Sequence, residues 1–292
     1  MAPQAATSNQ IRDAWDTVAD GFDEHVTPRT LELGEHIVSR LGLSPGVRVI
    51  DIGAGSGALS LPAARAGAEV LAIDIAPTMV EHLAARAEAA GLTSLRAEVG
   101  DATALDLGDD AFDVAVSLNG VSVIPDLTGG LHEMVRVTKA GGQVVVAAFG
   151  PMPKVEFVGF FFGALRTIAP DQLPAPDEPP APFRLADAAT FRQTLEGVGL
   201  TEVGIDVVTW ETTFASVDDY LDVLMSSNPI TQQVTERLTG EQRDEVRQVL
   251  DGMLRERAGG QAGAAPCCAA RSTSVTASSE GTHEFARAAG GR

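Results

Sequence analysis

The chain contains few positively charged residues. Of its 292 residues, 21 are Lys or Arg and 40 are Asp or Glu, which gives a formal net charge of -19. The two lysines, Lys139 and Lys154, are separated in sequence, and no basic run occurs. Proteins that bind nucleic-acid backbones or anionic membrane surfaces use clustered Lys and Arg. The composition therefore argues against a nucleic-acid or membrane partner.

Cysteines and long apolar runs are also scarce. The cysteines, Cys267 and Cys268, are adjacent and close to the C-terminus, so we expect neither a disulfide framework nor a metal site built on them. No run approaches the ~18–20 apolar residues that span a bilayer. The N-terminal sequence lacks the basic and apolar regions of a signal peptide. We therefore expect a cytoplasmic protein.

Apolar periodicity in the first 150 residues predicts an α/β fold. Helical spacing over 8–42 predicts N-terminal helices that cap the domain behind them. Strand-like runs alternate with helices beyond that point. The expected strands are 47–53, 68–75, 94–102, 112–120 and 141–150, and the expected helices are 77–90 and 126–139. This order predicts a Rossmann-like, doubly wound and mostly parallel sheet with helices on both faces.

The second half of the chain differs in composition. An aromatic stretch follows Gly150, and the proline-rich segment 169–183 is expected to be an extended loop within a helical lid insertion. Further elements are expected as helices at 187–198, 216–227 and 229–257 and a strand at 202–214. The segment 259–292 is rich in Gly, Ala, Ser and Thr and offers little apolar surface to bury.

The most informative segment is VIDIGAGSGALS, residues 49–60. A strand ends there, glycines turn the chain, and a helix begins whose N-terminal amides face a ligand. The string from Gly53 to Ala58 even satisfies the dinucleotide fingerprint G-x-G-x-x-A. Asp51 separates the alternatives, because a carboxylate would repel a pyrophosphate and attract a ligand that carries an ammonium and a sulfonium.

With Asp51 included, this segment resembles the first motif of the class I S-adenosylmethionine-dependent methyltransferases, which is an acidic residue, one spacer and G-x-G-x-G. The chain is also similar to ubiquinone/menaquinone-type and natural-product small-molecule methyltransferases. They share the pattern W-x-x-x-A-x-x-F, which is present here as Trp15, Ala19 and Phe22. The resemblance implies S-adenosyl-L-methionine as the cofactor.

The resemblance also implies roles for residues that follow successive strands. Asp74 would accept hydrogen bonds from the ribose hydroxyls, and Asp101 would hold the adenine, against which Ile75 and Met79 would pack. Asn119 falls in the fourth motif, near the methionine and the acceptor. Any one acid alone could instead be a helix cap or a solvated strand end. The complete expected set is Asp51, Gly53, Ala54, Gly55, Gly57, Asp74, Ile75, Met79, Asp101, Ala102 and Asn119.

The acceptor side is less well defined by the sequence. Positioning can accelerate an in-line displacement without a base when the acceptor is already nucleophilic. If a base is needed, His25 and His132 are the candidates. The phenylalanines that follow strand five either line a hydrophobic pocket or only anchor the lid. The expected pocket residues are Phe157, Phe160, Phe161, Trp15 and Phe22, with Phe162, Trp210 and Tyr220 beside them.

The expected organisation has four parts. Cap helices occupy 1–44, the cofactor-binding Rossmann-like core 45–150, and the substrate lid with the sixth strand and C-terminal helices 151–258. A low-complexity, disordered tail covers 259–292. Methyltransferases of this class usually end in a seventh, antiparallel strand. Only 271–278 could form it, so we expect a weak or missing seventh strand.

The sequence thus favours a small-molecule methyltransferase that acts on carbon or oxygen of a hydrophobic acceptor. One alternative is an NAD-dependent oxidoreductase, which is disfavoured by Asp51 and by the lack of a Tyr-x-x-x-Lys pair. Another is a catalytically silent protein that binds S-adenosylmethionine. The expected partner is the acceptor itself, and the sequence leaves a homodimer open.

Overall fold

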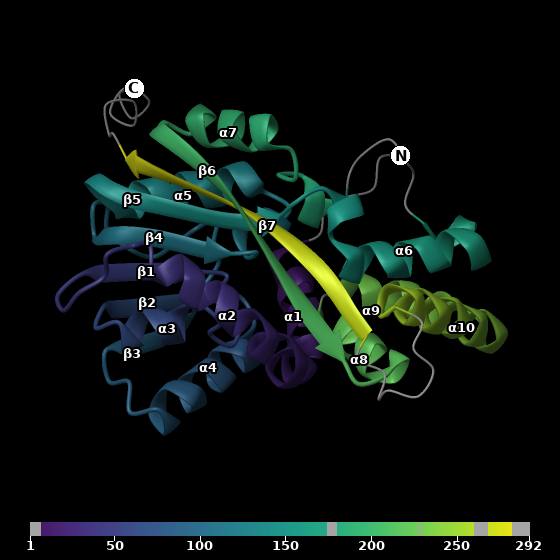
Figure 1. Ribbon diagram of the computed structural model, residues 1–292. Coiled ribbons are helices and arrows are strands. Elements are labelled where there is room, and N and C mark those ends of the chain that lie inside the picture. The colour runs from purple at the N-terminus through teal and green to yellow at the C-terminus, as the bar shows by residue number, and fades with distance from the viewer. Residues whose placement is uncertain (1–6, 174–179, 228, 260–267, 282–292) are drawn as a thin grey trace.

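The computed structural model describes residues 7–173, 180–227, 229–259 and, for the backbone alone, 268–281. Within them, seven strands form one sheet in the order β3-β2-β1-β4-β5-β7-β6 (Figure 1). The strands are β1 Arg48–Ile52, β2 Glu69–Asp74, β3 Leu95–Val99, β4 Phe112–Leu118, β5 Thr138–Phe149, β6 Leu200–Phe214 and β7 Cys268–Gly281.

The first five strands form the doubly wound sheet that the sequence predicts. Every pair among them is parallel, and the order reverses between β1 and β4. Ligands of such sheets bind outside the carboxyl ends of the strands at this reversal, because two crossover helices leave in opposite directions there. The fold therefore places a ligand site beyond Ile52 and Leu118.

Helices cover both faces of the sheet and form a separate layer at one end (Figure 1). The α-helices are α1 Ser8–Gly21, α2 Thr27–Val38, α3 Ser60–Arg65, α4 Pro77–Ala89, α5 Leu127–Val137, α6 Glu156–Ile168, α7 Ala188–Gly197, α8 Val217–Ser227, α9 Pro229–Arg237 and α10 Gly240–Arg257. A π-helix, η1 Phe22–Val26, joins α1 to α2. Short 3₁₀ turns are η2 Val121–Val123, η3 Met152–Lys154, η4 Pro170–Gln172 and η5 Ala181–Phe183.

Three apolar clusters hold these layers together. One lies between the sheet and α5 with α7, and a second lies between the other face of the sheet and α2, α3 and α4. The third joins α6, α8, α9 and α10 around Phe161 and Tyr220. The predicted helix 229–257 is two helices, because α9 ends at Arg237 and Thr239 begins α10 as its N-cap, through a capping box with Gln242. No helix in the described part of the chain is long and apolar enough to cross a membrane.

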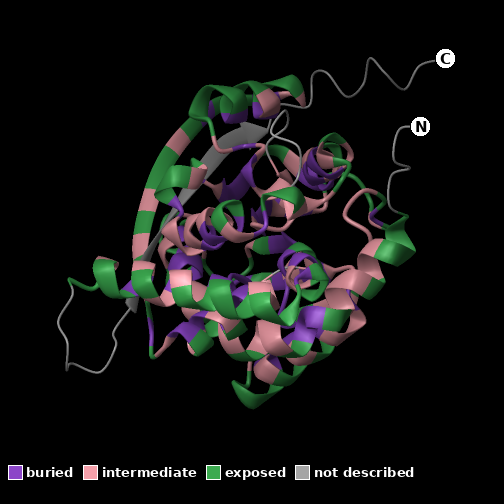
Figure 2. Ribbon diagram, turned by 90° about the vertical axis from the view of Figure 1, so that its right-hand side faces the viewer, coloured by how far each residue is buried: buried purple, intermediate pink, exposed green. Residues whose placement is uncertain are grey.

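The expectation of a weak or missing seventh strand is wrong. β7 pairs antiparallel with β5 from Gln143 to Phe149 and with β6 from Leu200 to Phe214. Insertion between two strands satisfies backbone groups on both of its edges, and this outweighs a poor strand composition. In Figure 2 the outer neighbour β6 alternates between exposed and intermediate residues along the sheet edge. The expected disordered tail is therefore wrong for 268–281, whereas 260–267 and 282–292 lie outside the described residues.

Gly34 sets how closely α2 approaches the chain that leads into α3. A Cβ at this position would lie 1.9 Å from the carbonyl oxygen of Ala58, which is backbone and cannot turn away. We expect Gly34→Ala to lower the free energy of unfolding by about 2–3 kcal/mol in urea denaturation. Gly252→Ala is the matched control, because it is also inside a helix but has open space around it. It should stabilise the protein by about 0.5–1 kcal/mol, and equal effects of the two substitutions would contradict the packing argument.

Candidate active site

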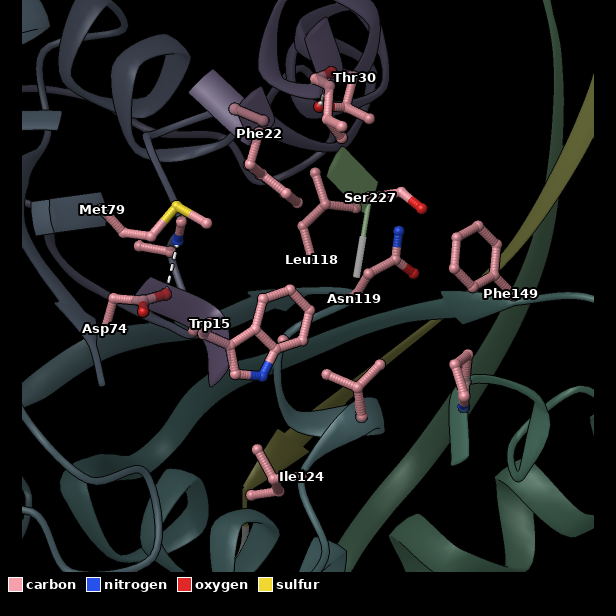
Figure 3. Close-up of a pocket in the computed structure, with 18 of the residues that line it drawn as sticks. Trp15, Phe22, Thr30, Asp74, Met79, Leu118, Asn119, Ile124, Phe149 and Ser227 are labelled. Atoms are coloured by element: carbon pink, nitrogen blue, oxygen red, sulfur yellow. Dashed lines mark hydrogen bonds between the residues drawn. The ribbon is translucent and has the colours of Figure 1, made fainter. Parts of the chain in front are cut away.

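A cavity of about 400 Å³ lies at the carboxyl ends of the parallel strands. The cap formed by α1, η1 and α2 covers one side, and residues of α6, β6 and α8 complete the wall. Side chains from these distant segments point into one space, as Figure 3 shows for Trp15, Asn119, Phe149 and Ile124. The cavity therefore lies where the strand order predicts a ligand site.

The glycine turn after β1 forms the floor of the cavity. Gly53 has a φ of 69°, and a Cβ there would lie 2.7 Å from the Cα of Gly120, the residue that follows the β4 turn. Gly55 has a φ of 53°, and a Cβ there would lie 3.2 Å from the ring of Phe22. These glycines allow the ends of two strands and the cap to approach one another closely. Ala54 lines the cavity with them.

The sequence predicts that Gly57 contacts the cofactor, but Gly57 does not line the cavity. Its φ is 102°, and a Cβ would lie 2.2 Å from Cδ1 of Leu83 on α4. The residue therefore lies against the helix layer behind the turn. Its absence of a side chain serves packing of α4 and not ligand approach.

Asp51 is a buried carboxylate in the cavity wall. Oδ2 accepts a hydrogen bond of 2.5 Å from the Ser60 hydroxyl, while Oδ1 has no protein partner among the described residues. Burial, together with the neighbouring Asp74 carboxylate, raises the pKa of Asp51 to about 7 against the opposing bond from Ser60. An unpaired buried carboxylate is unfavourable without a positive or hydrogen-donating partner, so the site is suited to a cationic ligand.

Asp74 is fixed by backbone donors at the end of β2. Its Oδ2 accepts from Gly55 N–H at 2.8 Å, and its Oδ1 accepts from Ala76 N–H at 3.0 Å. Burial raises its pKa, and these backbone bonds oppose the rise. Because a carboxylate oxygen has two lone pairs, both oxygens can still accept from a ligand diol.

Asp101 lines the cavity beyond β3 and is tied to the cap. Its Oδ2 accepts from the Ser8 hydroxyl at 2.7 Å, and its Oδ1 accepts from the backbone and hydroxyl of Thr103. Burial raises the pKa of Asp101, but these bonds and the charge of Arg12 outweigh it and hold the pKa below its usual value. The neighbouring Ala102 also lines the cavity.

An apolar slot lies between Asp74 and Asp101. Met79 is buried and packs with Trp15 and Phe22 of the cap, and Ile75 lines the same part of the cavity. Trp15 and Phe22 meet edge to face with their centroids 6.4 Å apart. A flat ring of a ligand could insert here with both faces covered, because side chains of the cap and of α4 provide opposite walls.

Asn119 follows β4 in a left-handed conformation, with a φ of 55°. Asparagine tolerates this region better than most residues, and the turn directs its amide into the cavity (Figure 3). Its Oδ1 is buried and has no hydrogen-bond partner among the described residues. Together with Oδ1 of Asp51, it offers an acceptor to a ligand donor.

The expected acceptor residues are only partly brought together. Phe157 lines the cavity, as do Phe162 and Trp210, which the sequence placed beside the expected set. Phe161 is 1% exposed within the α6–α10 cluster, and Phe160 also packs against that cluster, so neither lines the cavity. Tyr220 lies in the same cluster, and its hydroxyl donates to the carbonyl of Phe157.

The structure does not place either histidine candidate for the general base in the cavity. His25 lies in η1 beside Glu24, with 3.9 Å between Nε2 and Oε2, and it does not line the cavity. His132 is exposed on α5, and it does not line the cavity either. Neither is placed to remove a proton from a molecule bound there.

Several cavity residues were not predicted from the sequence. They come from the cap, from the end of β5 and from the lid, and they include Ile11, Val26, Arg29, Thr30, Phe149, Phe183 and Ser227. The cap members share a face with Trp15 and Phe22 at regular helical spacing, but Pro28 indicates a break between the two apolar runs of the sequence. In the structure Pro28 lies in the first turn of α2, so the same face continues to Arg29 and Thr30.

The cap is joined to α4 by contacts that advance in step along both segments. Each joins an acid of the cap to a donor of α4: Asp16 Oδ1 to Thr78 N–H at 2.9 Å, Asp20 Oδ1 to His82 Nε2 at 2.8 Å, and Asp23 Oδ1 to Arg86 Nε at 2.5 Å. Since α1 covers the slot at Met79, these contacts hold the cover closed.

We expect Arg86→Gln to weaken binding of S-adenosylhomocysteine by about 2–5-fold. The variant loses the ion pair with Asp23, and a partly exposed pair of this kind contributes about 1 kcal/mol or less. Isothermal titration calorimetry measures the change. Arg255→Gln is the control, because it removes an ion pair with Asp251 within α10. Equal affinities of wild type and Arg86→Gln would show that the contacts do not hold the cover.

Comparisons with known proteins agree with this geometry. Residues 49–142 match the model of a methyltransferase domain. An uncharacterised protein of Mycobacterium tuberculosis is 41% identical over 138 residues, which are 47% of this chain and 48% of that protein. The chain thus spans about half the length of such relatives. A demethylmenaquinone methyltransferase of Renibacterium salmoninarum is 34% identical over 172 residues, which cover 55% of this chain and 69% of that enzyme.

The fold is shared with solved methyltransferase structures. One is phosphoethanolamine N-methyltransferase 2 of Haemonchus contortus, in complex with phosphomonomethylethanolamine and S-adenosylhomocysteine. It superposes with a TM-score of 0.56 at 14% identity and covers 96% of this chain and 61% of that one. Two kinds of observation identify the same family. They are the glycine turn with the acids at the strand ends, and the sequence similarity that covers 69% of the Renibacterium enzyme. The chain belongs to the class I S-adenosylmethionine-dependent methyltransferases.

Proposed function

We propose that this protein transfers a methyl group from S-adenosylmethionine to carbon or oxygen of a small hydrophobic acceptor. The observation that carries the proposal is a single cavity that joins three strand-end acids to an aromatic wall. When bound, S-adenosylmethionine supplies a methyl group on a positively charged sulfur. The residues of this chain bind, orient and enclose the two reactants.

The residues present fit this cofactor. The buried oxygens of Asp51 and Asn119 that lack protein partners are both acceptors, which suits a ligand with an ammonium and a sulfonium. Asp74 would accept from the ribose hydroxyls, and the slot at Met79 would hold the adenine beside Asp101. A dinucleotide fits less well, because Arg29 is the one cationic side chain among the described residues of the cavity.

Aromatic side chains support the choice of a hydrophobic acceptor. The chain has 11 Phe, 2 Trp and 1 Tyr. Eight of these rings line the described cavity: Trp15, Phe22, Phe149, Phe157, Phe162, Phe183, Trp210 and Phe214. Such a concentration in one wall favours a flat, weakly polar molecule over a phosphate ester or a peptide.

Methyl transfer from a sulfonium requires mainly that the protein position the two reactants. An in-line displacement needs the nucleophile, the methyl carbon and the sulfur on one line, and a cavity that holds both reactants in this alignment can supply up to about 7–11 kcal/mol of the barrier. The cap and the lid cover part of this cavity. Their apolar walls also strengthen the attraction between the reactants.

The test combines binding with transfer. Calorimetric titration with S-adenosylhomocysteine and with NAD should give saturable binding of the first alone. Methyl-labelled S-adenosylmethionine should then label at least one member of a panel of phenols, naphthols, quinols and 1,3-dicarbonyl compounds. Binding of NAD alone would refute the proposal. Cofactor binding without transfer to any acceptor would favour the catalytically silent alternative.

A further inference from the structure

Ionisable groups are distributed unevenly around the cavity. Among the described residues that line it, the carboxylates are Asp51, Asp74, Asp101 and Asp126, and the cation is Arg29. No histidine, lysine, cysteine or tyrosine of the described chain joins them. Three of the acids lie at or just beyond the carboxyl ends of β1, β2 and β3, on the proposed cofactor side, and Asp126 caps α5. Among the described lining residues that come from α2, the end of β6 and α8, Arg29 is the one ionisable side chain, so none of them is a general base.

Arg29 is held firmly in that wall. Its Nη1 donates to the carbonyl of His25 at 2.7 Å, and its Nη2 donates to Asp219 at 2.9 and 3.3 Å. Its guanidinium carbon lies 5.7 Å from the ring centroid of Phe214. These three bonds leave at least two of the five N–H donors of a guanidinium without a partner in the described chain.

The position of Arg29 follows from the face of the cap that lines the cavity. Phe22, Val26, Arg29 and Thr30 all line it, with the spacing of one face of a continuous helix. Phe22 lies against Gly55 of the glycine turn. One face of the cap therefore extends from the glycine turn at Gly55 to the guanidinium of Arg29.

We propose that Arg29 selects acceptors that ionise in water near neutral pH, namely acidic phenols and acidic 1,3-dicarbonyl compounds, and binds them as the phenolate or enolate. This inference rests on the proposed methyl transfer and names its acceptor class. Such an acceptor needs no protein base, and a guanidinium in an apolar wall attracts an anion with little screening. Asp219 fixes the orientation of the guanidinium and is not itself among the residues that line the cavity, so the N–H donors of Arg29 without a described partner are those available to an acceptor anion.

Charge balance in the transfer agrees with this selection. A lone pair of the acceptor forms the bond to the methyl carbon while the bond from that carbon to sulfur breaks, and sulfur keeps the electron pair. The negative charge of the acceptor and the positive charge of the sulfonium cancel. No proton has to leave during the step, so the lack of a base in the described wall carries no penalty.

The experiment uses 4-nitrophenol as the probe, bound to the protein saturated with S-adenosylhomocysteine. The absorbance of its phenolate reports its ionisation. We expect wild type to lower the pKa of the bound phenol by about 1 unit or more, as an opposite charge within a few ångströms does. Arg29→Gln should abolish the shift and Arg29→Lys should keep most of it. Arg247→Gln, which breaks a surface ion pair with Asp218, should leave it unchanged.

A second measurement needs no variant. Above the pKa of 4-nitrophenol, wild type should bind this probe at least about tenfold more tightly than neutral 4-nitrotoluene, and below that pKa the preference should disappear. No saturable binding of 4-nitrophenol, a preference for its neutral form, or a shift that survives Arg29→Gln would overturn the proposal. If one of these results occurs while S-adenosylhomocysteine still binds normally, the proposed role of Arg29 is contradicted and the proposed methyl transfer is not. If the wild-type protein does not bind S-adenosylhomocysteine, the proposed methyltransferase function itself is contradicted.

Discussion

Asp51→Asn is expected to stabilise the cofactor-free protein at pH 8 and to leave its stability nearly unchanged at pH 4. Burial raises the pKa of Asp51 from 3.8 to about 7, so between these values the folded state holds a proton that the unfolded state releases. The contribution of Asp51 to the free energy of unfolding should therefore fall as the pH rises through this window, and the difference between wild type and variant isolates it. The shift corresponds to about 4 kcal/mol. Asparagine carries no charge to desolvate, so its contribution should not vary with pH.

Urea denaturation without cofactor at several pH values measures this difference. Asp244→Asn on the exposed face of α10 is the control, and its effect should not depend on pH in the same way. The same Asp51→Asn variant should bind S-adenosylmethionine at least about tenfold more weakly, since the buried negative charge attracts the cationic ligand. Its affinity for adenosine, which carries neither charge, should change little. A difference in stability between Asp51→Asn and wild type that stays the same from pH 4 to pH 8, or equal losses of affinity for both ligands, would contradict this account.

The cofactor half of the site could be predicted because its residues follow strand ends. Asp51 and Asp74 lie in the last residues of β1 and β2, Asp101 follows β3, and adjacent parallel strands bring their carboxyl ends to one edge of the sheet. Local sequence therefore determines that they meet. The same reasoning fails for Gly57, since a motif does not tell whether a glycine faces a ligand or the helix behind it.

The acceptor half could not be predicted in the same way. Phe161 and Phe162 are adjacent in a helix, so they point about 100° apart, and only the packing of α6 against α10 decides which one reaches the cavity. Arg29 follows Pro28, and the direct continuation of η1 into α2 brings it onto the cavity face of the cap. The pairing of β7 depends on two strands distant in sequence. In each case tertiary contacts determine what local propensity leaves open.

Asp74→Asn is expected to weaken binding of S-adenosylhomocysteine about 100-fold, which corresponds to roughly 2.7 kcal/mol. An amide has one acceptor oxygen, so its NH₂ group would face one of the two backbone N–H donors, Gly55 or Ala76. That donor would lose its partner in a partly buried turn, and one ribose hydroxyl would lose its acceptor. Each such loss costs about 1–3 kcal/mol. Calorimetric titration measures the affinity.

Asp126→Asn is the matched control, because Asp126 also lines the cavity and accepts from a backbone amide, Gly129, but is exposed. Its effect should stay below about threefold. Adenosine and 2′-deoxyadenosine then separate ribose recognition from support of the turn. Wild type should prefer adenosine, and Asp74→Asn should lose most of that preference, since the carboxylate that accepts from the hydroxyl is gone. If the variant keeps the full preference, Asp74 only orders the glycine turn, and the ribose must be held by another group.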